Sequence, residues 1–142
     1  MSRPELGWYG EQIVKHVLES KGHVVETAKD LYDSEKDLKV NGKSAEVKTI
    51  QLYRKQNLCS IRQHQIEKCT NVDYLFFVLT PDDYGRNFIE VVGYPKCCRY
   101  WIEYKTSHRH MFGLKLSNSY SVEKIYDDKL VDKMRRLTYT QY

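Results

Sequence analysis

Two carboxylates and one lysine lie close together in the stretch from Lys36 to Gln51 (KDLKVNGKSAEVKTIQ). The acids are Asp37 and Glu46, and Lys48 follows Glu46 by two residues. Carboxylate oxygens are hard ligands that suit Mg²⁺ or Mn²⁺, and Mg²⁺ typically keeps positions for water and substrate phosphate. These residue types indicate metal-dependent chemistry at a phosphate, provided that the fold brings them together.

A β-hairpin is the element that we expect to position these side chains. Asn41-Gly42 supplies the two residues of positive φ that a type I′ turn needs. A two-residue loop there places Asp37 directly opposite Glu46, and like charges in that position repel. We therefore expect a cation between them, with Lys48 alongside. Alternation puts a set of apolar residues on the other, buried face: Leu38, Val40, Ala45 and Val47.

The pattern of Asp37, eight residues and then Glu46-Val47-Lys48 resembles the motif of the PD-(D/E)XK nuclease superfamily. Glu11, on the helix expected before the hairpin, takes the place of the additional acidic residue in that superfamily. The order of elements in the first eighty residues is similar to small archaeal-type Holliday junction resolvases and to compact phage and restriction-like nucleases. The resemblance does not extend to the C-terminal part of the chain.

This resemblance implies a metal-dependent endodeoxyribonuclease that hydrolyses phosphodiester bonds in DNA. Asp37, Glu46 and the backbone carbonyl of Val47 would hold Mg²⁺ or Mn²⁺. Glu11 would hold a metal-bound water or a second ion, and Lys48 would orient the attacking water. A homodimer is expected, because duplex DNA has twofold symmetry and two strands to cut. A further set of polar residues is expected to contact the nucleic acid: Gln51, Arg54, Lys55, Arg62 and Gln63.

Several alternatives stay open at this point. With the same site, the enzyme could be a structure-selective Holliday junction resolvase or a homing or restriction-type endonuclease, and RNA could replace DNA. A non-catalytic nucleic-acid-binding module could keep the fold without binding a metal, and a purely structural protein is the third class. The triplet Glu103-Tyr104-Lys105 is a second match to Glu-x-Lys, but no opposing acid is predicted for it.

The apolar pattern predicts one α/β domain with a central mixed β-sheet flanked by helices. The resemblance implies that the core, about residues 3–94, has the restriction-endonuclease-like order αβββαβ, and that about 95–142 form a C-terminal extension. Besides the hairpin arms, the expected strands are 23–27, 58–61, 73–80, 87–94 and 111–116. The expected helices are 3–21, a helix capped by Ser60 that runs to Cys69, and 122–137.

The composition is that of a soluble protein, with 142 residues of which 41% are hydrophobic and 30% charged. No apolar run approaches the ~20 residues of a membrane span, and the first residues lack the apolar core of a signal peptide. We therefore expect an intracellular protein that acts in the cytoplasm, or a phage protein that acts in the host cytoplasm. The net charge of +4 is modest, and the basic second half is either a phosphate-contacting ridge or a solvated surface.

The four cysteines are expected to be reduced thiols in such a protein. A metal site is the alternative for part of the set, because Cys and His are zinc ligands. The candidate ligands for that site are Cys97, Cys98, His108 and His110.

Overall fold

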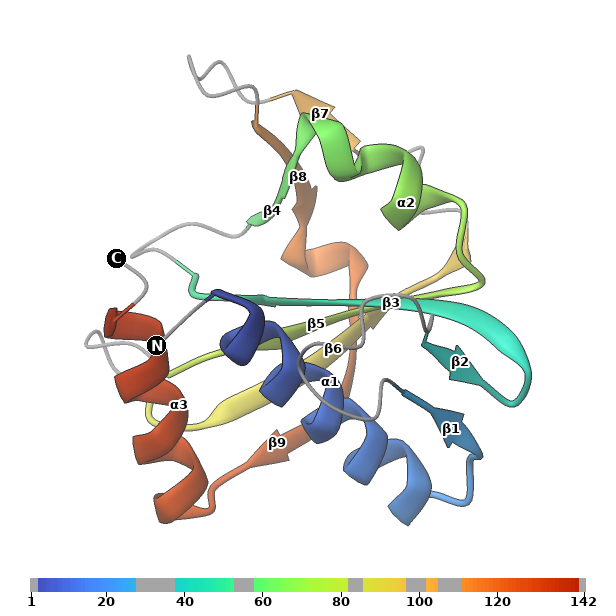
Figure 1. Cartoon of the computed structure of the whole chain (residues 1–142). Helices are drawn as coiled ribbons and strands as arrows, with labels where there is room; N and C mark the ends of the chain where they lie inside the picture. The colour runs from blue at the N-terminus through green and yellow to red at the C-terminus, as the bar shows by residue number, and fades with distance from the viewer. Residues whose placement is uncertain are drawn as a thin grey trace.

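The chain folds around a six-stranded mixed β-sheet that has helices on one face and a small second sheet on the other (Figure 1). The computed structural model describes residues 3–27, 38–52, 58–81, 86–96, 102–104 and 111–140. The helices are α1 (Arg3–Ser20), α2 (Ile66–Thr70) and α3 (Asp128–Thr140), with 3-10 turns η1 (Gln63–Gln65) and η3 (Leu116–Asn118). The strands are β1 (Val25–Glu26), β2 (Lys39–Val40), β3 (Lys43–Ile50), β4 (Leu58–Arg62), β5 (Tyr74–Leu79), β6 (Ile89–Tyr94), β7 (Ile102–Tyr104), β8 (Met111–Lys115) and β9 (Tyr120–Ile125).

The large sheet has the strand order β1-β2-β3-β5-β6-β9, and the small sheet has the order β4-β8-β7. Strands β3 and β5 are parallel, and the connection between them carries β4 and α2 across one face of the sheet. The other neighbours are antiparallel. The predicted mixed α/β fold with a helix-flanked sheet is confirmed. The order αβββαβ is present, with β4 as an additional strand that joins the small sheet.

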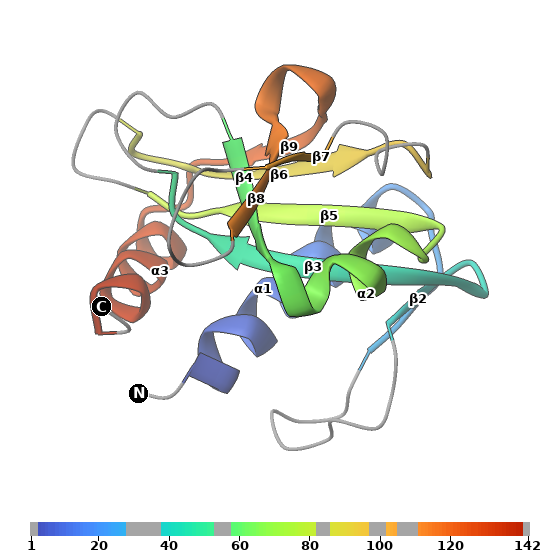
Figure 2. The same ribbon diagram turned by 90° about the horizontal axis from the view of Figure 1, so that it is seen from above.

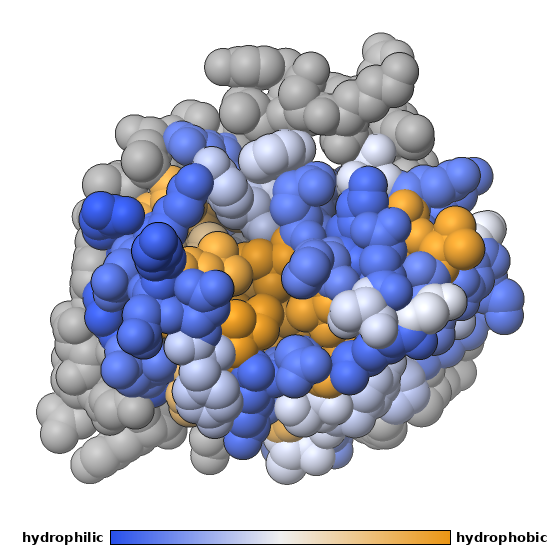
Figure 3. Space-filling view, turned by 90° about the horizontal axis from the view of Figure 1, so that it is seen from below, coloured by the Kyte–Doolittle hydropathy of each residue, from blue (hydrophilic) through white to orange (hydrophobic). Residues whose placement is uncertain are grey.

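The two faces of the large sheet carry separate apolar clusters. On the helix side, Val47, Phe76 and Val91 pack with residues of α1 and α3. Seen from this side, apolar side chains gather in the middle of the surface within a hydrophilic surround (Figure 3). On the opposite side, Phe77 and Tyr94 pack with residues of the small sheet and α2. The molecule therefore has three layers, with the sheet between the helices α1 and α3 and the β4–β8–β7 layer (Figure 2).

The predicted hairpin is confirmed as far as the described residues extend. Asn41 and Gly42 have φ values of 51° and 79°, as a type I′ turn needs, and Val40 lies opposite Lys43. The Ala45 N–H donates to the Leu38 carbonyl oxygen at 3.0 Å, which extends the predicted register to Leu38. The residues predicted for the apolar face are all buried: Leu38, Val40, Ala45 and Val47. Asp37 lies outside the described residues.

Helix α1 ends in a Schellman motif at Gly22, whose φ of 91° is accessible to glycine at little cost. The N–H of His23 donates to the carbonyl of Leu18, and the N–H of Gly22 donates to that of Glu19. Near its middle the helix packs closely on β3. Glycine at position 10 permits this approach, since a Cβ there would clash with the Thr49 hydroxyl. This close approach brings Glu11, the next residue of α1, near β3.

Two predicted helices differ from the structure. Ser60 lies in β4 rather than at a helix cap, because Cys59 and Ile61 are buried by strand alternation and β4 pairs with β8. The predicted helix 122–137 is a strand followed by a helix, since Tyr120–Ile125 pairs with β6. The helix α3 is capped by Asp127, whose Oδ1 accepts hydrogen bonds from two N–H groups at 3.0 and 3.1 Å. No helix in the described ranges combines the length and the apolar character that a membrane crossing needs.

Candidate functional site

Glu46 and Lys48 project from the same face of β3, away from the buried pair Ala45 and Val47. The Lys48 Nζ lies 3.4 Å from Glu46 Oε1, and the two side chains are 19% and 11% exposed. The two residues share a face because alternate residues of a strand do so. The structure therefore brings together the Glu and the Lys of the predicted triplet, in a partly desolvated position where an ion pair is stronger than in water.

A second lysine, Lys68, contacts the other oxygen of the same carboxylate. Its Nζ lies 3.5 Å from Glu46 Oε2, and its side chain is 64% exposed. Lys68 comes from α2, which lies over β3 and β5 on the side of the sheet opposite to α1 (Figure 2). Sequence reasoning missed Lys68, because only the crossover from β3 to β5 carries α2 to this place. The signal in the sequence was weak: Lys68 precedes the buried Cys69 on a short helix.

Glu11 brings a second carboxylate to this cluster from α1. It follows Gly10, the point where α1 packs on β3, and it is half-buried. Burial is the main cause that raises the pKa of Glu11, and the charge of Glu46 raises it further, while Lys68 and Lys48 lower it. The predicted site residues Glu11, Glu46 and Lys48 are thus electrostatically coupled, although they come from two different elements.

The donor set of this cluster fits a hard divalent cation. Two carboxylates, Glu11 and Glu46, are within the number that Mg²⁺ usually takes from a protein. A cation between them would also relieve the repulsion that raises the pKa of Glu11. Within the described ranges no group of three or more acidic, His or Cys side chains is placed to hold a metal. Asp37, the predicted third acid, lies outside those ranges.

The other predicted contact residues lie after β3, at the end of β4 and in η1, or outside the described part. Gln51 is half-buried directly after β3, and Arg62 and Gln63 are exposed at the end of β4 and in η1. Of the rival triplet, Glu103 lies in β7 opposite Gly113. The remaining residues named from the sequence lie outside the described ranges: Arg54, Lys55, Cys97, Cys98, Lys105, His108 and His110.

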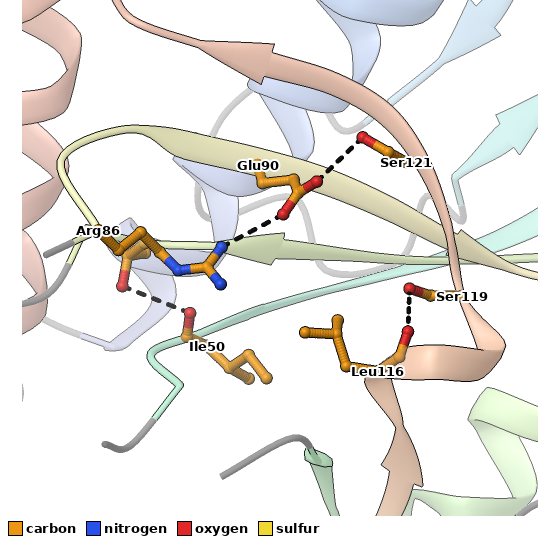
Figure 4. Close-up of polar contacts among 7 residues, drawn as sticks. Ile50, Arg86, Glu90, Leu116, Ser119 and Ser121 are labelled. Carbon is orange, nitrogen blue, oxygen red and sulfur yellow. Dashed lines mark hydrogen bonds and ion pairs between the residues drawn. The ribbon is translucent and has the colours of Figure 1, made fainter. Parts of the chain in front are cut away.

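A second polar cluster lies on the same face of the sheet, where β6 and β9 pair (Figure 4). The Arg86 Nη1 lies 3.3 Å from Glu90 Oε1, and the Ser121 hydroxyl donates to Glu90 Oε2 at 2.9 Å. Arg86 also lies over the ring of Phe88, 5.4 Å from its centroid. Nearby, burial raises the pKa of the Cys59 thiol to about 11, so this cysteine is a poor nucleophile at neutral pH.

Comparison with protein families, with curated proteins and with solved structures finds no match for this chain. The cluster formed by Glu11, Glu46, Lys48 and Lys68 is therefore the feature of the molecule that points to a function.

Proposed function

We propose that the protein is a metal-dependent endodeoxyribonuclease whose site is built on Glu46, Lys48 and Glu11. One observation carries this proposal: both oxygens of Glu46 have an ammonium group within 3.5 Å, from β3 and α2, and the charge of Glu46 raises the pKa of a second acid, Glu11 on α1. A structural ion pair needs one acid and one base. The additional acid and base suit a site in which a bound cation would replace the lysines as the partner of the carboxylates. A substrate phosphate would then become the partner of the lysines.

The carboxylates are the part of the site that would hold the cation. Glu46 is fixed by β3, and Glu11 approaches from α1 with a pKa raised by burial and by Glu46. When bound there, Mg²⁺ would polarise the scissile phosphate and lower the pKa of a coordinated water. The backbone carbonyl of Val47 and the side chain of Asp37 are the further ligands that the sequence motif proposes.

The two lysines have different exposures, and we assign them different roles. Lys48 is 19% exposed and held by β3, so it can orient the attacking water and stabilise charge that develops in the transition state. Lys68 is 64% exposed, so its ammonium group can move from Glu46 to a phosphate oxygen of the substrate. That movement of Lys68 would leave Glu46 Oε2 available to the cation.

The test is to incubate the protein with Mg²⁺ and labelled duplex, single-stranded and four-way-junction DNA, with matched RNA substrates. We expect cleavage of DNA in Mg²⁺, and binding without cleavage when Ca²⁺ replaces it. Preference for the four-way junction would identify a resolvase, and preference for one duplex sequence would identify a restriction-type or homing enzyme. Absence of cleavage on every substrate in Mg²⁺ and in Mn²⁺ would overturn the proposal.

A second candidate, a non-catalytic nucleic-acid-binding module, is favoured by one observation. Both oxygens of Glu46 already have a lysine within 3.5 Å, so the cluster is charge-balanced without a cation. Titration calorimetry with Mn²⁺ separates the two candidates. Binding of Mn²⁺ by the wild type and its loss in Glu46→Gln would support the nuclease, whereas no heat in either protein would support the module.

A twofold homodimer is part of the same proposal, because each copy would then present one site to each strand. Sedimentation of the protein alone and with a short duplex measures this directly. A species of two chains on one duplex is the expected result, and a single chain that cuts both strands would contradict it.

A further inference from the structure

A second group of charged residues lies at the start of β3, next to the proposed catalytic cluster. Asp73 is its centre: Lys96 Nζ lies 2.9 Å from Asp73 Oδ1, and the Ser44 hydroxyl donates to Asp73 Oδ2 at 3.3 Å. The Asp73 N–H donates to the carbonyl and to the hydroxyl oxygen of Ser44, at 3.0 and 3.2 Å. The group therefore joins β3, the turn before β5 and the end of β6.

This group lies on the same face of the sheet as the catalytic cluster. Ser44, Glu46 and Lys48 are alternate residues of one strand, and Ser44 is two residues from Glu46. A strand rises about 3.3 Å per residue, so these two side chains start about 7 Å apart. This spacing is about one or two nucleotide steps along a DNA strand.

Lys96 is the charged residue of this group that an anion could reach. Lys96 lowers the pKa of Asp73 most, by a hydrogen bond and by its charge, and Ser44 and Lys43 lower it further. The Lys96 side chain is 74% exposed, and exposed ion pairs of this kind stabilise a fold very little. A phosphate that approached this group could take the Lys96 ammonium group and the Ser44 hydroxyl from Asp73.

We propose that Lys96 and Ser44 form a phosphate subsite for the DNA strand, one or two nucleotides from the bond cut beside Glu46. The substrate assignment rests on the proposed function. Asp73 is a positioning residue in this subsite: it holds Lys96 in place and competes with the phosphate for its charge. The subsite would contribute to affinity and to the position of the strand, and not to the chemical step.

The opposite effects of two substitutions test this assignment. Binding of a labelled duplex is measured in Ca²⁺ by fluorescence anisotropy over a series of salt concentrations. Lys96→Ala should weaken binding by roughly two- to fivefold, the range of one exposed charge pair, and reduce the salt slope by about 1. Asp73→Asn should strengthen binding and steepen the slope, because the competing charge is removed.

The matched control is Lys21→Ala. Lys21 also forms an exposed ion pair, with Glu123 at 3.5 Å, but on the helix side of the sheet, where Glu123 pairs with Val91. Its loss should leave affinity and salt slope unchanged. Equal effects of Lys21→Ala and Lys96→Ala would mean that only net charge matters, and would overturn the subsite. Weaker binding by Asp73→Asn would overturn it as well, because a merely structural Asp73 predicts that sign.

Neutral methylphosphonate linkages, placed singly along one strand, locate the contact. We expect one position to weaken binding by the wild type and to have no effect on Lys96→Ala. If that pattern is found but Mg²⁺ supports no cleavage, the phosphate subsite is supported and the proposed nuclease activity is overturned. If DNA is cleaved and no position distinguishes Lys96→Ala from the wild type, the subsite is overturned and the nuclease stands. The same pattern with RNA alone would overturn the assignment to DNA.

Discussion

Two half-buried glutamates lie on the same face of the large sheet, and their surroundings differ. Glu46 on β3 has a side chain that is 11% exposed, and Glu90 on β6 has one that is 13% exposed. Both contact a cation at 3.3–3.4 Å. Exposure and distance alone therefore do not distinguish a candidate site from a structural ion pair in this molecule.

The number of neighbouring charges does distinguish them. Glu90 is bound by the guanidinium of Arg86, four residues earlier, and by the hydroxyl of Ser121 (Figure 4). Glu46 has two lysines and a second carboxylate, Glu11, whose pKa is raised by burial and by Glu46 itself. A pair of acids that repel each other costs stability, and such costs are typical of functional sites. The additional carboxylate, Glu11, therefore distinguishes the surroundings of Glu46 from those of Glu90.

The largest expected effect comes from neutralising Glu46, with the same substitution at Glu90 as its comparison. Glu46→Gln should lower the rate of Mg²⁺-dependent DNA cleavage by about 10³-fold, because a neutral amide holds a divalent cation poorly and charge stabilisation is lost. Glu90→Gln, the matched substitution, should keep the rate within about twofold for the folded fraction. The measurement is single-turnover cleavage at saturating protein. Equal losses in the two variants would mean that both glutamates act only through the fold.

Within the Glu46 cluster, the two lysines should differ. Lys48→Met should lower kcat by about 10²-fold with little change in KM, since its partly buried charge acts mainly in the transition state. Lys68→Ala should mainly raise KM, because an exposed lysine contributes to binding of the phosphate. Steady-state kinetics on one duplex separate the two parameters. A larger loss of kcat in Lys68→Ala than in Lys48→Met would reverse the roles proposed for them.

The shared face of Glu46 and Lys48 on β3 could be predicted from the sequence, because local rules determine it. The turn at Asn41-Gly42 sets the register, and alternation then fixes which side chains share a face. Glu11 was found through the resemblance. Lys68 could not be found in this way, because its place over Glu46 depends on the path of the chain between β3 and β5.

The contacts of Glu90 with Arg86 and Ser121 could not be predicted from the sequence. Arg86 and Glu90 are four residues apart, a spacing that is as compatible with one face of a strand as with one face of a helix. Their third partner, Ser121, belongs to β9, a segment next to the one that the sequence assigned to a helix from Val122 onward. The apolar residues there fit both periods, and the cap at Asp127 that separates strand from helix went unrecognised. A single wrong assignment therefore hid both β9 and this cluster.

The effects on stability should run in the opposite order to the effects on cleavage. Glu90→Ala should lower the free energy of unfolding by about 1–3 kcal/mol, because the half-buried Arg86 loses its carboxylate partner. Glu46→Ala should cost less, because it also removes the repulsion with Glu11. Urea denaturation of both variants without metal gives the two values. A greater loss in Glu46→Ala would show that Glu46 is the more important residue for the fold.

The smallest expected effect concerns Glu11, and its size depends on pH. Burial raises the pKa of Glu11 in the folded protein above its value in the unfolded chain, and Glu46 adds to the shift. The folded state therefore binds the proton more tightly, so Glu11 contributes stability at low pH that is lost as pH rises through the folded pKa. Glu11→Gln should be more stable than the wild type at neutral pH, by less than about 1 kcal/mol given solvent screening.

This difference should disappear below the usual range of a glutamate, near pH 4, and it should also shrink when Mg²⁺ is added. The cation would favour the ionised carboxylate and so stabilise the wild type more than Glu11→Gln. The matched control is Glu19→Gln, on the exposed side of the same helix, which should show neither effect. Thermal melts from pH 4 to pH 8, with and without Mg²⁺, measure both. A variant of Glu11 that is less stable than the wild type at neutral pH would mean that its carboxylate stabilises the fold, and the contrast with Glu90 would then be lost.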